Sequence, residues 1–168
     1  MQLYLVRHGV ARDISEPGVI NDVDRPLSPQ GEACTRQVAA GLARLSPRIS
    51  RVISSPLLRA MQTAEIFSEV LAIGGAVEPC DALASEHHIE EVIQWIKGQS
   101  DGGLMLVGHM PSLALMVSRL VCGSNELAAM HFEKAGLCRL SFDGSILPGT
   151  AMMEWLMPPS VLRALSGE

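Results

Sequence analysis

Two arginines and two histidines stand out in the sequence because together they could bind and transfer a phosphoryl group. They are Arg7 and His8 near the N-terminus, Arg59, and His109 in the second half of the chain. Guanidinium groups bind phosphoryl oxygens in a bidentate geometry, and an imidazole nitrogen can attack phosphorus to form a covalent phosphohistidine. The sequence contains no Walker loop and no aspartate-rich metal motif, so we expect the protein's own cations to balance the phosphoryl charge, with no cofactor and no metal.

Short apolar runs precede these positions and predict the strands that hold them. Residues 2–6, 51–54 and 104–107 are apolar or β-prone and too short for helices. Parallel strands end at the same edge of an α/β sheet, and ligand crevices form at that edge. We therefore expect the four side chains to converge although they are far apart in sequence.

Arg59 gives a further indication of an anion at this edge. It falls in the first turn of the helix predicted after Ser55-Pro56. The positive end of a helix dipole disfavours a cation there by about 0.3–1 kcal/mol. A bound phosphate would remove this conflict, because helix amides and a guanidinium both stabilise it.

The remaining pattern predicts an α/β fold: a three-layer sandwich with a mostly parallel central sheet, helices on both faces and a C-terminal antiparallel hairpin at the sheet edge. We expect one domain over residues 1–168. Helices are predicted from Ser28-Pro29 to about Leu45, from Ser55-Pro56 to Gly74-Gly75, from Ile89 to Lys97 and from Pro111 onwards. Further strands are predicted at residues 76–80, 137–142 and 151–156, the last two forming the hairpin, with a loop at 10–27.

Composition excludes several classes of protein. The net charge of −5 argues against nucleic-acid binding, which needs clustered Lys and Arg. No apolar run approaches the roughly 20 residues that span a bilayer, and no export signal is visible, so we expect a cytoplasmic monomer with no membrane partner. The widely spaced cysteines predict free thiols and no zinc site; they are Cys34, Cys80, Cys122 and Cys138.

Four segments of the chain carry a family resemblance: Leu5-Val6-Arg7-His8-Gly9, Arg25-Pro26-Leu27-Ser28-Pro29-Gln30-Gly31, Ser54-Ser55-Pro56-Leu57-Leu58-Arg59-Ala60-Met61-Gln62-Thr63-Ala64 and Val107-Gly108-His109. Together they resemble the histidine phosphatase superfamily. The short chain, together with Trp155 and Pro158 near its end, is most similar to the small phosphohistidine phosphatases of that family.

The resemblance implies a role for each matching residue. His8 would be the nucleophile that becomes phosphorylated, while Arg7, Arg59 and His109 would bind the phosphoryl oxygens together with it. Arg25 would contact the substrate or fix its own loop. The implied substrate is phosphohistidine on a signalling or phosphotransfer protein, such as a phosphotransfer domain.

A general acid is harder to find in the sequence. Phosphatases that act on esters must protonate an alkoxide, and many relatives use a carboxylate after a middle strand. Glu86 is the nearest candidate, although the pattern favours a solvated loop carboxylate at this position. Imidazole is a far better leaving group, with a solution pKa of roughly 6.5, so a phosphohistidine substrate does not need this acid. The alternative is a small phosphate ester or nucleotide as substrate, with Glu86 as the acid.

Two other classes remain open at this stage. One is a non-catalytic phosphate-binding module, which the presence of all four site residues disfavours. The other is a metal hydrolase built from His87, His88 and His131. Adjacent histidines point in different directions on regular backbone, and no carboxylate lies at ligand spacing, so we expect no such metal site.

Overall fold

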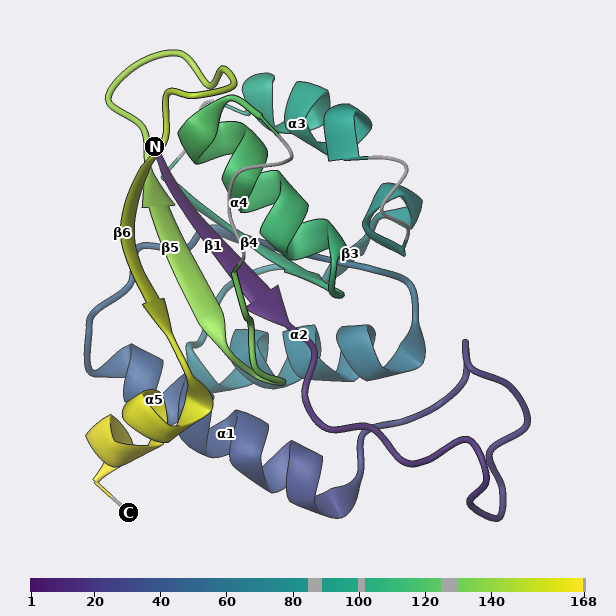
Figure 1. The fold of residues 1–168 in the computed structure, drawn as a ribbon. Coiled ribbons are helices and arrows are strands. Elements are labelled where there is room, and N and C mark those ends of the chain that lie inside the picture. The colour runs from purple at the N-terminus through teal and green to yellow at the C-terminus, as the bar shows by residue number, and fades with distance from the viewer. Residues whose placement is uncertain (85–88, 100–101, 125–129, 168) are drawn as a thin grey trace.

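A six-stranded sheet forms the centre of the protein in the computed structural model, which describes residues 1–84, 89–99, 102–124 and 130–167 (Figure 1). The strand order is β3-β2-β4-β1-β5-β6. The first four strands in the chain, β1 to β4, are all parallel to one another. Strand β5 pairs antiparallel with both β1 and β6. The strands are β1 (Gln2–Arg7), β2 (Arg51–Ser54), β3 (Glu78–Pro79), β4 (Gly103–Gly108), β5 (Leu137–Ser141) and β6 (Met152–Met157).

Helices cover both faces of this sheet, which confirms the predicted three-layer α/β sandwich with its edge hairpin. One face is covered by α1, α2 and α5, and the other by α3 and α4 (Figure 1). Within the described ranges, no helix is long and apolar enough to cross a membrane. The helices are α1 (Pro29–Ala43), α2 (Leu58–Val70), α3 (Ile89–Lys97), α4 (Ser112–Cys122) and α5 (Pro159–Ser166), with a short 3-10 helix η1 (Asp81–Ala84) before α3.

The central strand β1 separates two hydrophobic clusters. Leu3 and Leu5 point to the side of α3 and α4, whereas Tyr4 and Val6 point to the side of α1 and α2. All four are essentially inaccessible to solvent. This alternation is the period of two expected of a strand, and burial on both faces explains the continuous apolar run. The end of β1, where Arg7 lies, is therefore fixed by packing on both sides.

Helix α2 begins later than the sequence predicted. Ser55-Pro56 was expected to cap it, but the chain stays extended through Leu57 (ψ 132°) and the helix starts at Leu58. Ser55 lies two residues before the N-cap residue Leu57. Its hydroxyl accepts the amide of Leu57 at 3.4 Å and lies 2.8 Å from Nε2 of His109. The first helical amide, that of Leu58, donates instead to the carbonyl of Val23 at 3.0 Å. Residues 10–27 therefore close on the start of α2.

Other bounds differ from prediction in minor ways. Helix α1 ends at Ala43 and α2 at Val70, earlier than the predicted Leu45 and Gly74-Gly75, because the chain adopts positive φ at Ser46 and Ala72 just beyond each end. Strand β3 covers only Glu78–Pro79 of the predicted 76–80, since just two residues pair with β2.

The C-terminal helix α5 was not predicted at all. Its signal is weak in the sequence: eight residues that follow Pro158, with Pro159 at the first position. Its main contact is with α1, where a Cβ on Gly41 would lie 1.8 Å from the carbonyl oxygen of Leu162. Only a glycine at position 41 allows this approach of the two backbones, and Leu162 is buried there completely. The helix is thus specified by a partner that is more than a hundred residues away in the chain.

Candidate active site

The sheet brings His8 and His109 together. Strand β1 pairs with β4 so that Arg7 lies opposite Gly108, and each histidine follows directly after its strand. The two imidazole rings lie with centroids 4.9 Å apart and planes inclined by 53°. The positive charges of Arg7 and Arg59 act on both rings, lowering their pKa values. The four predicted side chains therefore meet at the carboxyl edge of the sheet.

His8 has the tautomer and charge of a nucleophile. Its Nδ1 lies 2.7 Å from the carbonyl oxygen of Gly9, which can only accept, so Nδ1 carries the proton and Nε2 keeps its lone pair. Burial lowers the pKa of His8 to about 3, and His109, Arg59 and Arg7 add to the effect, while the bond to Gly9 opposes it. The ring is 7% exposed. At neutral pH, His8 is a neutral imidazole with one free nitrogen.

His109 is also neutral in the free protein. Burial lowers its pKa to about 4, and Arg59 and Arg7 contribute, whereas Asp22 partly offsets them. Its Nε2 lies 2.8 Å from the hydroxyl of Ser55. A dianionic phosphoryl group would favour the protonated form of this ring, because an opposite charge within a few ångströms stabilises the cation.

The arginines offer donors to an anion. Arg7 is held by a bond from Nη1 to the carbonyl of Phe132 at 2.6 Å. The Nε–H groups of Arg7, Arg25 and Arg59 are buried and have no acceptor among the described residues. Buried donors of this kind cost free energy unless an acceptor reaches them. A tetrahedral oxyanion is one acceptor that could satisfy several guanidinium groups at once.

A threonine that the sequence analysis did not single out connects two parts of the site. Thr63 Oγ1 accepts the amide hydrogen of Gly9 at 3.0 Å and donates to the carbonyl of Arg59 at 2.7 Å. Gly9 is itself confined, because a Cβ at this position would lie 2.5 Å from Oγ1 of Thr35. Gly9, the residue after His8, and the first turn of α2 are thus held together by one hydroxyl.

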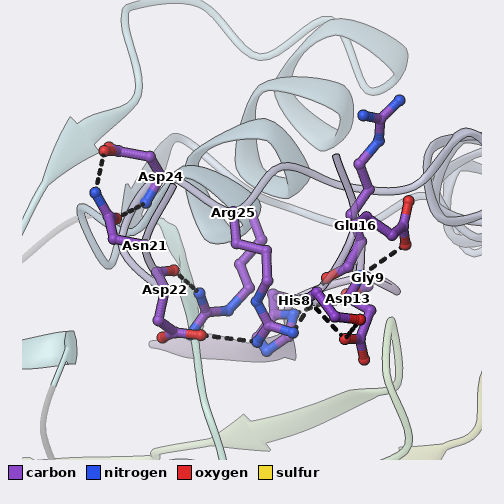
Figure 2. A network of polar contacts seen from close by, with 11 residues as sticks. His8, Gly9, Asp13, Glu16, Asn21, Asp22, Asp24 and Arg25 are labelled. Carbon is purple, nitrogen blue, oxygen red and sulfur yellow. Dashed lines mark hydrogen bonds and ion pairs between the residues drawn. The ribbon is translucent and has the colours of Figure 1, made fainter. Parts of the chain in front are cut away.

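Asp22 is the second residue that sequence reasoning missed. Its carboxylate bonds Arg59 through Oδ2 and Arg25 through Oδ1, both at 3.0 Å (Figure 2). Arg25 also donates to the carbonyl of Arg12 at 3.1 Å. Arg25 therefore joins the edge of the site through Asp22. The only feature of the sequence that could have indicated Asp22 is the presence of two aspartates, Asp22 and Asp24, next to Arg25. Such a group of charges is also typical of an ordinary loop.

The candidate acid Glu86 lies outside the described residues, as do His87 and His88. His131 is described and is exposed. In the described part of the chain, no group of three or more His, Cys, Asp or Glu side chains is placed to hold a metal ion.

Comparison with known proteins places the chain in a family. The family model described as "Histidine phosphatase superfamily (branch 1)" matches residues 3–88. The fold is an α/β sandwich with two histidines and two arginines at one edge of its sheet, and the chain belongs to the histidine phosphatase superfamily.

Individual relatives and solved structures show which members of the superfamily the chain resembles. The chain is 27% identical to the phosphohistidine phosphatase SixA of Escherichia coli K12, over 97% of each chain. It matches a structure of the protein histidine phosphatase SixA complexed with tungstate with a TM-score of 0.81 and 25% identity, over 96% of this chain and 99% of that one. The α-ribazole phosphatase of Shigella flexneri shares the fold, with a TM-score of 0.74 and 15% identity over 95% and 97% of the two chains.

The lowered pKa values predict how stability depends on pH. The pKa values of about 3 for His8 and about 4 for His109 lie below the roughly 6.5 of an imidazole in the unfolded chain. As the pH falls below about 6.5, the unfolded state binds protons first, so the free energy of unfolding decreases by up to about 1.4 kcal/mol per pH unit for each ring. Denaturant unfolding in phosphate-free buffer should therefore show a shallower acid loss for His109→Gln than for the unsubstituted protein between pH 6.5 and 4.5. Equal slopes, or a ring of His8 or His109 that titrates near pH 6.5 by NMR, would contradict this.

Proposed function

We propose that this protein removes phosphate from phosphohistidine on a signalling or phosphotransfer protein, through a covalent intermediate on His8. The observation that carries the proposal is the geometry of His8: a neutral ring with Nδ1–H held by Gly9 and a lone pair on Nε2, beside His109 and within the field of two arginines. The resemblance to SixA over nearly the whole chain supports the substrate class.

In the first step, Nε2 of His8 attacks phosphorus while the bond from phosphorus to the substrate imidazole breaks. The substrate ring leaves as neutral imidazole if its second nitrogen is protonated, and this protonation is available near neutral pH because imidazole titrates at roughly 6.5. On the enzyme, His8 becomes an N-phosphorylated imidazolium that retains its Nδ1 proton. The carbonyl of Gly9, 2.7 Å from Nδ1, stabilises the new positive charge.

In the second step, water attacks phosphorus and the bond to Nε2 breaks. His8 leaves as a neutral imidazole and the proton of the water passes to solvent or to the released phosphate. Arg7, Arg59 and His109 would stabilise the equatorial oxygens in both transition states, where charge is spread over them. Neither step requires a general acid from the protein, since a histidine departs each time.

Leaving-group chemistry therefore separates the proposed substrate from its alternative. A phosphohistidine protein should be hydrolysed faster, by kcat/KM, than phosphosugars or nucleotides tested at equal concentration, because an alkoxide must be protonated on departure. The panel should be assayed with and without a chelator, and chelation should change nothing. Faster turnover of the sugar or nucleotide esters would contradict the proposed substrate.

The second candidate is a small phosphate ester or nucleotide with Glu86 as the acid. This protein shares its fold with an α-ribazole phosphatase, and we therefore retain this alternative for testing. Glu86→Gln separates the two, because loss of the acid would reduce ester hydrolysis by about 10²-fold or more while leaving a P–N bond substrate nearly unaffected.

A further inference from the structure

Asp22 makes contacts that a bound phosphate would be expected to make. Each carboxylate oxygen meets a different guanidinium, Oδ2 that of Arg59 and Oδ1 that of Arg25, both at 3.0 Å (Figure 2). The main-chain carbonyl of Asp22 accepts a further bond from Nη1 of Arg59 at 2.7 Å. One anionic residue thus engages both terminal nitrogens of Arg59.

The segment that carries Asp22 is anchored at its base and at its far end. At the base, the amide of Arg12 donates to Pro26 and that of Ser28 to Val10, both at 2.9 Å. At the far end, the carbonyl of Val23 accepts from Leu58 at the start of α2. Figure 1 shows this segment extending from the end of β1 past the body of the sheet. Asp22 is therefore presented to α2 by the loop that follows β1 and His8 in the chain.

Burial of the two partners is unequal. The Arg59 side chain is only 7% exposed, whereas that of Asp22 is 59% exposed. A buried cation without an anion is costly, but an exposed carboxylate is easily released because surface ion pairs contribute only about 0–1 kcal/mol. Burial raises the pKa of Asp22, but Arg59 and Arg25 lower it more, so the carboxylate is ionised at neutral pH. Asp22 is therefore suited to be an ion-pair partner of Arg59 that a more highly charged anion can replace.

We propose that Asp22 is a resident counter-ion of Arg59 that competes with phosphate for this guanidinium, so that it lowers the affinity of the site for free anions and assists release of orthophosphate. The proposal rests on the proposed function in one respect, that Arg59 binds the phosphoryl group. Asp22 occupies one N–H on each terminal nitrogen of Arg59. A dianion that binds this edge of the guanidinium competes with Asp22 for those N–H groups, and the two negative charges repel each other. Substrate affinity then depends on contacts elsewhere, which a phosphoprotein can supply and free phosphate cannot.

The test compares Asp22→Asn with Asp24→Asn. Both remove one negative charge from the same segment, but the Asp24 carboxylate bonds Asn21 at 2.8 Å, in contrast to the two arginines that Asp22 binds. Tungstate and orthophosphate binding is measured by isothermal titration calorimetry on the full chain. Asp22→Asn should bind both anions about three- to tenfold more tightly, as expected from losing competing ion pairs that contribute up to about 1 kcal/mol. Asp24→Asn should change affinity by less than about twofold.

Thermal unfolding provides the second readout. Without anions, Asp22→Asn should unfold at a lower temperature than the unsubstituted protein, because Arg59 loses a charged partner. Saturating tungstate should then raise its unfolding temperature by more than it raises that of the unsubstituted protein, since ligand binding stabilises in proportion to affinity. Weaker anion binding by Asp22→Asn would show that Asp22 orients Arg59 for phosphate, and equal tightening in both variants would show a general charge effect; either result overturns the proposal.

Activity measured on the same samples distinguishes this proposal from the proposed function. If Asp22→Asn binds anions more tightly but no sample hydrolyses phosphohistidine, the counter-ion stands and the proposed function fails. If the unsubstituted protein is active and Asp22→Asn does not bind more tightly, the proposed function stands and the counter-ion fails. Failure of both proteins to bind either anion contradicts both proposals.

Discussion

Replacing His8 with alanine is expected to reduce phosphohistidine hydrolysis by at least about 10⁴-fold, since removal of a covalent nucleophile leaves only binding and electrostatic stabilisation. His8→Ala should also fail to retain labelled phosphate after denaturation. The buried ring is 7% exposed, so His8→Gln, which keeps more of its volume, is the second variant. Thermal unfolding of both variants shows whether the fold persists.

His131→Ala is the matched control, because His131 is an exposed histidine outside the cluster. It should keep full activity and should retain the label. His109→Ala separates the two roles: it should turn over more slowly but still be labelled on His8. Retained activity in folded His8→Ala, or label found on His109, would refute the proposed intermediate.

Replacing Arg59 is expected to produce the second largest loss. Arg59→Met should lower kcat/KM by about 10²–10³-fold, the usual cost of removing one preorganised group that stabilises transition-state charge. Arg59→Lys keeps the charge but loses the planar fork and should recover only part of the activity. Because Asp22, the carboxylate left behind, is 59% exposed, it can be solvated without its partner. The activity loss should therefore not be accompanied by unfolding.

The control for this substitution is Arg36→Met, which removes an exposed arginine paired with Glu69 on the surface of α1 and α2. It should leave kcat/KM unchanged to within about twofold, as surface ion pairs contribute little. Steady-state kinetics and thermal unfolding are measured on all three variants. Activity of Arg59→Met within threefold of the unsubstituted protein would contradict a phosphoryl-binding role.

The meeting of four distant side chains could be predicted from sequence because it follows from strand polarity. Short apolar runs before His8 and His109 and between residues 51 and 54 indicated parallel strands, and parallel strands end at one edge. The register that opposes Arg7 to Gly108 then places the two rings side by side. This part of the site depends on regular structure, for which local patterns are informative.

Asp22 and α5 could not be predicted because both depend on tertiary contacts. A single carboxylate in a loop follows no hydrophobic pattern that would mark it in the sequence. Asp22 binds Arg59 only because the folded loop brings the two residues together. Helix α5 is short and is held by the approach of Leu162 to Gly41, a contact between two residues far apart in the sequence. The predicted start of α2 was wrong for a related reason. Ser55 has the residue type of a good helix cap, but in the folded protein it lies beside His109 and the helix begins at Leu58. In each case a distant partner overrides the local preference.

The hydroxyl of Thr63 couples two parts of the candidate site. It joins the amide of Gly9 to the carbonyl of Arg59, so the proposed nucleophile His8, which precedes Gly9, and the proposed phosphate ligand Arg59 are positioned relative to each other by a third residue. A displacement of about 1 Å between such groups can cost 10²-fold in rate. Without the hydroxyl, the buried amide of Gly9 would need another acceptor. A substitution at Thr63 is therefore expected to disturb Gly9 and Arg59 together, although 54 positions separate Thr63 from Gly9.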